Sequence, residues 1–296
     1  MCYNVNIQKT KTEKETNKMK KIISLILCVA LCFALGVALT SCGDEEKAKD
    51  TKVAVQAGTT SELYAKVLKG VEVVSHETFP NAATDMKNGN VDYVFCDKTT
   101  AKTLCKDIPG LKIIDIALSS ENYGIGIDPA QTTLKAQIDA ILEAKAAEID
   151  AIKDKYMNGE TDKYVGVTSA TKKDDKAAAQ LVVATNAEFA PWEYKEGDKF
   201  YGIDMEIAQI LANELGLELV IEDMAFDAVV SSVGKHNVDI AMSGITITAE
   251  RLDIINFSTP YYTEAIVLVC LENDKSFDSA GTVVDVLNTI CYPSED

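Results

Sequence analysis

Residues 181–222 read LVVATNAEFAPWEYKEGDKFYGIDMEIAQILANELGLELVIE, in which two apolar runs flank an amphipathic segment. Residues 181–185 are apolar and contain β-branched side chains, which favours a buried strand. Residues 204–215 repeat apolar side chains at helical spacing, and Gly216 follows where a helix would end. Residues 217–222 are strand-like again. A strand, a helix and a second strand in this order predict a parallel βαβ unit.

The same alternation of short apolar runs and helical patterns continues through much of the chain. Residues 134–156 keep an apolar face at helical spacing, as one long helix or as two joined end to end. Residues 164–179 are small and polar, and predict a linker that buries little surface. We therefore expect an α/β fold in two blocks with mostly parallel sheets. Further strands are predicted at residues 53–56, 71–75, 91–96, 112–116, 238–242 and 265–271, and further helices at 61–68, 82–88 and 99–105.

The composition favours a binding function over catalysis. The 296 residues carry 29 Lys and Arg against 46 Asp and Glu, a formal net charge of −17. No excess of basic groups is left to neutralise a phosphate backbone, which excludes nucleic acid as a partner. Only two histidines are present, so a multi-histidine metal site is excluded and acid–base catalysis has little to use. We expect no metal site, no cofactor and no catalytic residue.

An apolar run at residues 22–39 follows two lysines and ends in the letters LTSC at residues 39–42. This ending resembles the lipobox of bacterial lipoproteins, which implies cleavage before Cys42 and a lipid anchor on its thiol. An uncleaved signal anchor is the alternative. Met19 begins a complete signal-peptide pattern by itself and is an alternative start of the chain. The protein is therefore expected to be exported and lipid-anchored to a membrane, at the cell surface or on the periplasmic face.

Four cysteines belong to the body of the protein rather than to its leader: Cys96, Cys105, Cys270 and Cys291. Four thiols in an exported protein permit two disulfides. A chain of this length builds its own core without them. Two disulfides and four free thiols both remain open.

Six stretches of the chain form an ordered set of motifs. The second block carries TNAEFAPWEY at residues 185–194, GID at 202–204, SGITITAER at 243–251 and FSTPYY at 257–262, and the first block carries QAGTTS at 56–61 and VDYVFCD at 91–97. Together they resemble polar amino-acid substrate-binding proteins of ABC importers, the family 3 extracellular solute-binding proteins. The resemblance implies a two-lobe, periplasmic-binding-protein-like (type II) fold with a hinge. It also implies an amino acid bound between the lobes and delivered to ABC permease subunits.

The order of the lobes departs from that family. Its usual chain runs through the first lobe, the second lobe and back to the first, whereas here the block that resembles the second lobe comes first. A circular permutation, with the old ends joined near residues 158–179, accounts for this order. The expected boundaries are 1–41 for the signal peptide, 42–51 for a lipid-anchored linker, 52–120 for the second lobe, 121–158 for a return segment packing on the first lobe, 159–179 for a linker, 180–270 for the first lobe, and 271–296 for the crossing back to the second lobe and the C-terminal tail.

A zwitterionic ligand needs a partner for each of its charges in a partly dry cleft. Arg251 is the expected clamp for the carboxylate, because a guanidinium offers a two-pronged donor; an exposed helix face is the alternative for this residue. The family position of Asp97 implies that it binds the ammonium from the other lobe, with a helix N-cap as the alternative. The expected ligand-binding set is Gln56, Thr59, Thr60, Asp97, Asn186, Phe189, Trp192, Phe226, Ser243, Gly244, Thr246 and Arg251.

Simpler roles remain open for several members of this set. Thr59 and Thr60 suit helix capping, Gly244 suits a turn, and Phe189, Trp192 and Phe226 suit the core as well as a pocket wall. Asn186 is neutral where the family often has Asp, and Gln56 stands where some glutamine binders carry Lys. A polar or neutral amino acid is favoured as ligand. A basic amino acid remains an alternative, with Glu188 as its partner.

The preferred hypothesis is a lipid-anchored, monomeric receptor for an amino acid, with the membrane and an ABC permease as its partners. One alternative is a dehydratase-like enzyme on the same fold, which would need a free acid or base in the cleft. Another is a sensory lipoprotein without a transport role.

Overall fold

The computed structural model describes residues 51–174 and 179–292. The predicted signal peptide and the lipidation site at Cys42 lie outside the described residues. Within these two ranges, no helix combines the length and the apolar character needed to cross a membrane.

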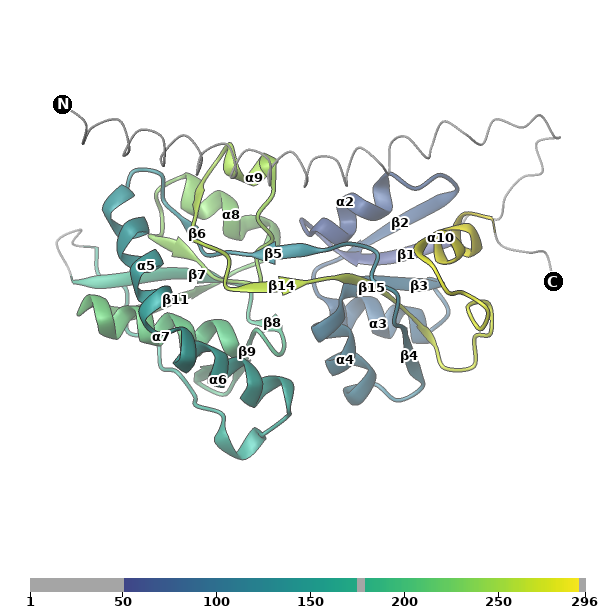
Figure 1. Cartoon of the computed structure of the whole chain (residues 1–296), viewed down its shortest axis with the longest axis horizontal. Helices are drawn as coiled ribbons and strands as arrows, with labels where there is room; N and C mark the ends of the chain where they lie inside the picture. The colour runs from purple at the N-terminus through teal and green to yellow at the C-terminus, as the bar shows by residue number, and fades with distance from the viewer. Residues whose placement is uncertain (1–50, 175–178, 293–296) are drawn as a thin grey trace, which may run out of the picture. The chain divides into compact units, whose positions relative to one another are not determined.

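One five-stranded sheet, in the order β2-β1-β3-β15-β4, forms the centre of what we call the second lobe (Figure 1). Val53, Val55 and Phe95 on its strands share an apolar cluster with Val286 and Ile290 of α10. The sheet therefore buries residues from both ends of the described chain. Its elements are β1 (Thr51–Gln56), α2 (Thr60–Lys66), β2 (Val71–His76), α3 (Phe79–Lys87), β3 (Tyr93–Asp97), α4 (Lys98–Asp107), β4 (Leu111–Ile114), β15 (Ile266–Leu271) and α10 (Val283–Cys291).

A second five-stranded sheet, in the order β11-β7-β12-β6-β13, forms the centre of the first lobe. Helices α5 and α6 meet at Lys145 and both contact α7, so the long helical stretch is two helices rather than one. A small sheet of β8, β9 and β10 lies in the chain between β7 and α7. The elements are β6 (Gly126–Ile127), α5 (Thr132–Ala144), α6 (Ala146–Met157), η1 (Thr161–Lys163), β7 (Gln180–Thr185), β8 (Glu188–Phe189), β9 (Glu193–Glu196), β10 (Lys199–Tyr201), α7 (Ile203–Leu215), β11 (Glu218–Asp223), α8 (Phe226–Gly234), β12 (Ile240–Ala241), α9 (Ala249–Leu252) and β13 (Asn256–Phe257).

The α/β fold in two lobes is confirmed, but the expectation of mostly parallel sheets is wrong. In the second lobe β1 pairs parallel with β2 and β3, whereas β15 pairs antiparallel with β3 and β4. In the first lobe β7 pairs parallel with β11 and β12, whereas β6 pairs antiparallel with β12 and β13. β6 and β15 are the strands by which the chain enters each lobe from the other. They run antiparallel to their neighbours because they come from the other lobe. The lengths of the connections within one lobe, on which the expectation rested, do not reveal this direction.

Two strands join the lobes: β5 (Glu121–Tyr123) and β14 (Tyr262–Glu264) pair antiparallel and run side by side between them (Figure 1). We call this pair the hinge ribbon. The second crossing comes just before β15, which already lies in the sheet of the second lobe. The first lobe therefore ends earlier than the expected boundary at residue 270.

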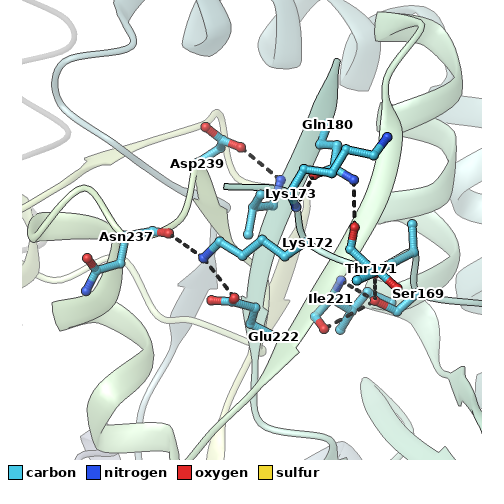
Figure 2. A network of polar contacts seen from close by, with 11 residues as sticks. Ser169, Thr171, Lys172, Lys173, Gln180, Ile221, Glu222, Asn237 and Asp239 are labelled. Carbon is cyan, nitrogen blue, oxygen red and sulfur yellow. Dashed lines mark hydrogen bonds and ion pairs between the residues drawn. The ribbon is translucent and has the colours of Figure 1, made fainter. Parts of the chain in front are cut away.

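The polar segment before β7 lies along the edge of a sheet, and the expectation that it buries little is wrong for part of it. β11 is an edge strand, whose outward backbone groups need partners. The N–H of Ala170 donates to the carbonyl of Leu219, and the hydroxyl of Ser169 accepts from the N–H of Ile221. Lys172 bonds to Glu222 at 2.8 Å (Figure 2). A small, polar composition thus serves here to cover a sheet edge.

The first and last described elements meet at one residue. Gly70 accepts a hydrogen bond from the N–H of Thr51 at 3.3 Å. The carbonyl oxygen of Cys291 lies 3.1 Å from the position that a Cβ atom would take on Gly70. Residues 51 and 291 are therefore close in space.

The four body cysteines, Cys96, Cys105, Cys270 and Cys291, are free thiols in the structure. In the described part of the chain, no group of His, Cys, Asp and Glu is arranged to hold a metal ion.

Candidate functional site

A small cavity lies between the two lobes. The volume open to water is about 10 Å³, room for roughly one water molecule. The structure therefore represents the lobes in a closed arrangement. The second lobe lines the cavity with Gln56, Thr59, Thr60 and Asp97, and the first lobe with Phe189, Phe226, Gly244, Thr246 and Arg251.

All of these lining residues belong to the ligand-binding set expected from the sequence. Three other members of that set, Asn186, Trp192 and Ser243, do not line the cavity. Glu188, the residue that the sequence analysis kept as a partner for a basic ligand, is exposed. The structure thus brings nine of the twelve expected residues together around one space, from opposite lobes and from distant parts of the chain.

Arg251 projects from the short helix α9 into the junction of the lobes. It is only 9% exposed, so the alternative of an exposed helix face is wrong. Its Nη1 donates to the carbonyl of Thr246 at 2.8 Å and its Nη2 to the carbonyl of Gly58, on the second lobe, at 3.0 Å. The guanidinium carbon lies 5.6 Å from the ring centre of Phe226. Burial lowers the pKa of Arg251, and the nearby Glu121 and Asp97 oppose this effect.

Asp97 ends β3 and precedes α4. It occupies the N-cap position, yet its side chain makes no capping hydrogen bond. The carboxylate is buried at the cavity wall, where burial raises its pKa well above the usual range and the carboxylates of Glu121 and Glu264 raise it further. A buried carboxylate of this kind gains most from a cationic partner.

Gly244 brings backbone up to the cavity. Its φ of +51° favours glycine, and its N–H donates to Oδ2 of Asp204 at 2.9 Å. A Cβ atom on Gly244 would lie 2.6 Å from the ring of Phe189. The turn and the close approach are therefore both present, and both exclude a side chain at this position.

Two buried carboxylates behind this turn went unrecognised in the sequence. Glu193 accepts from the hydroxyl of Ser243 at 2.6 Å, and Asp204 accepts from the hydroxyl of Tyr261 at 2.8 Å. Glu193 and Asp204 are both 0% exposed. Sequence periodicity assigns charged residues to exposed faces, so it gave no signal for them. The one signal was their place in two of the quoted motifs, TNAEFAPWEY and GID. Burial raises the pKa of Asp204 to about 7 and that of Glu193 well above its usual range.

The buried carboxyl of Asp204 predicts that the protein is more stable at mildly acidic pH. Its pKa is about 7 in the folded state against an ordinary value of 3.8, so the folded state binds more protons between these values and the free energy of unfolding falls as the pH rises through them. We expect a melting temperature roughly 5 °C or more higher at pH 5 than at pH 8. Asp204→Asn should make this profile less steep, with Glu193 still contributing, and the exposed Glu214→Gln on the same helix should leave it unchanged. A profile equally steep in Asp204→Asn would contradict the assignment.

Amide and hydroxyl groups complete the contact between the lobes. Thr59 caps α2 by accepting from the N–H of Glu62 at 3.2 Å, so its capping role is present together with its place at the cavity. Nε2 of Gln56 donates to Oδ1 of Asn186 at 2.8 Å across the lobes. In the closed arrangement Asn186 therefore bonds to the second lobe and does not line the cavity.

Trp192 is a core residue in this structure. It is fully buried, and its ring packs against Tyr123 and Tyr262 of the hinge ribbon with centroids 5.0 and 4.7 Å apart. Its indole N–H donates to Oγ1 of Thr99, on the second lobe, at 2.9 Å. The side chain therefore contacts the hinge and the opposite lobe instead of lining the cavity.

The two α/β lobes are joined by a two-stranded hinge and close over a cavity. A cation lies on one side of this cavity and a carboxylate on the other. This architecture is that of the two-lobe periplasmic-binding-protein class. Residues 181–290 match the family of bacterial extracellular solute-binding proteins, family 3.

Three similar proteins each overlap with about a third of the chain. The arginine-binding extracellular protein ArtP of Bacillus subtilis is 36% identical over 101 residues, which cover 34% of this chain and 40% of that protein. The L-cystine-binding protein TcyJ of Escherichia coli is 30% identical, with 36% of this chain and 40% of that protein covered. Among solved structures, the arginine-bound form of truncated ArgBP from T. maritima is 39% identical over 28% of this chain and 40% of that chain, with a TM-score of 0.28. The match spans about two-fifths of each of these relatives.

Proposed function

We propose that this protein binds an amino acid between its two lobes and delivers it to the permease of an ABC transporter. The observation that carries the proposal is the placement of Arg251 on one lobe and Asp97 on the other, at the wall of the same cavity. A zwitterion placed between them would offer a carboxylate to the first and an ammonium to the second. Each lobe would gain a charged contact only when the lobes close.

The size of the cavity supports a mechanism of opening and closing. A space of about 10 Å³ does not admit an amino acid, so the ligand enters when the lobes separate. The hinge ribbon is the place for this motion, because β5 and β14 are the connections between the lobes in the described chain. Arg251 would then exchange its contact with the carbonyl of Gly58 for the carboxylate of the ligand.

Export, a lipid anchor on Cys42, a monomeric state and a circular permutation are parts of the same proposal. The short distances from Gly70 to Thr51 and to Cys291 support the permutation. They show that the regions near residues 51 and 291 are close in space, and in the family's usual chain order these two regions would be joined. The names of the relatives, which mention arginine and cystine, support an amino acid as ligand.

A thermal-shift screen of the purified full chain against the twenty amino acids, followed by calorimetry of the hits, tests the proposal. A ligand at 100 times its dissociation constant adds about 2.7 kcal/mol of stability. Saturable, one-to-one binding of one chemical class is the expected result. A cooperative melt that no amino acid moves would overturn the proposed function, and turnover of an added acid would favour the enzyme hypothesis.

Trp192 should report closure of the lobes. It is the only tryptophan of the chain, and its hydrogen bond to Thr99 exists only while the lobes touch. We expect a bound amino acid to shift its emission to shorter wavelength and to reduce quenching by acrylamide, because closure removes the ring from water. Emission and quenching that stay unchanged under a ligand proven by calorimetry would show that binding does not close this contact.

A further inference from the structure

Two glutamates lie opposite each other in the hinge ribbon. In the antiparallel pairing of β5 and β14, Glu121 is the direct partner of Glu264. The two residues are only 8% and 5% exposed. Like charges directly opposite one another on neighbouring strands repel, so this arrangement costs stability unless another charge compensates for it.

Glu121 lies directly behind the wall of the cavity. Its Oε2 accepts from the hydroxyls of Thr60, on the second lobe, and Thr246, on the first, each at 2.7 Å. Its Oε1 accepts from the hydroxyl of Ser119 at 3.0 Å. Thr60 and Thr246 both line the cavity. All three donors are neutral, so they hold the carboxylate in place without cancelling its charge.

The acids around the cavity outnumber the cations. Among the described residues, no ion pair within 4 Å includes Asp97, Glu121, Glu264 or Arg251. The charge of Glu264 is offset in part by Lys102 of α4. Asp97 and Glu121 then remain against Arg251 alone, and both act on its guanidinium. Once a bound ammonium has ionised Asp97, these three side chains together carry one negative charge more than they have positive charges to balance.

A neutral zwitterion leaves this excess unchanged, because its two charges cancel. Closing the lobes over it would keep an unbalanced carboxylate away from water, which is costly. An amino acid with a second positive charge brings the sum to zero. We infer that the cleft selects amino acids with a cationic side chain, and that Glu121 is a specificity-determining residue for that choice. The inference rests on the proposed function and narrows it, away from the polar or neutral ligand that the sequence favoured.

Arginine and citrulline provide the decisive comparison, because a urea replaces the guanidinium at almost the same shape. Calorimetry on the full chain should give a dissociation constant at least tenfold lower for arginine than for citrulline. Lysine against glutamine repeats the comparison with a different pair.

Glu121→Gln removes the charge and keeps the shape. Since one carboxylate oxygen accepts from both threonines, the amide oxygen can accept from both as well. We expect the ratio of arginine affinity to citrulline affinity to fall by about tenfold in this variant, because arginine loses a balancing charge and citrulline no longer closes over an unbalanced one. The control is Glu218→Gln, which removes the same charge from the exposed strand β11, where Glu218 pairs with Lys173; its ratio should equal that of the wild type.

The outcomes distinguish failure of the inference from failure of the proposed function on which it rests. Citrulline or glutamine binding as tightly as its cationic counterpart would overturn the inference and leave an amino-acid receptor. An unchanged ratio in a folded Glu121→Gln variant would overturn the role of Glu121. If that variant fails to fold, the two ligand comparisons on the wild type still decide the charge preference. Failure of every amino acid to bind would overturn the inference and the proposed function together.

Discussion

Arg251→Ala should abolish measurable binding of the amino acid. The guanidinium is the cation that the cavity offers to a carboxylate, and removing one partner of a buried charge pair costs about 2 to 5 kcal/mol. A loss of this size weakens binding roughly 30- to 5,000-fold. Isothermal titration calorimetry with the best ligand of the wild type measures it directly.

Arg251→Lys is the matched control for this prediction. Lysine keeps the charge but not the fork by which Arg251 would hold the carbonyl of Thr246 and the ligand carboxylate at once. We expect binding weaker than in the wild type and stronger than in Arg251→Ala. A melting curve on each variant shows whether it is folded. Wild-type affinity in a folded Arg251→Ala variant would refute the carboxylate clamp.

Asp97→Asn should give the second-largest loss of affinity. The amide keeps the shape of the side chain at the cavity wall but cannot pair with an ammonium, so the ligand's positive charge is buried without its partner. We expect binding to weaken by about 2 kcal/mol or more, at least roughly 30-fold. Asp107→Asn, at the end of the adjacent helix α4 and exposed, is the control and should bind like the wild type.

The pH dependence of binding distinguishes loss of the Asp97 charge from loss of shape. Burial, together with Glu121 and Glu264, raises the pKa of Asp97 in the empty protein, and Arg251, Glu193 and Tyr123 also act on this carboxyl. A bound ammonium favours the ionised form, so the complex holds fewer protons and affinity rises with pH until Asp97 is ionised in the empty protein. The dependence should flatten in Asp97→Asn. An equally steep profile in the variant would assign the proton to another group.

Many of the cavity residues were predictable because they follow strands or open helices within short motifs. Asp97 ends β3, Thr59 and Thr60 open α2, and Thr246 precedes α9 by a few residues. Ends of neighbouring strands meet at the same edge of a sheet, so their side chains converge. Trp192 was misplaced for the opposite reason: an aromatic residue near such an end fits a pocket wall and a core equally well, and only packing distinguishes them.

The sequence by itself determined the local elements and an α/β fold in two blocks, because strand and helix periodicity and turn residues act over short distances. The two-lobe arrangement and the residues for a zwitterion came from the resemblance of its motifs to a known family. Only the tertiary structure decided the rest. It fixed the reversed direction of β6 and β15, the burial of Glu193 and Asp204, and the placing of Glu121 opposite Glu264. Each of these depends on which distant segments lie side by side. The burial of a charge and the sum of charges around a cavity are properties of that arrangement, and no local pattern records them.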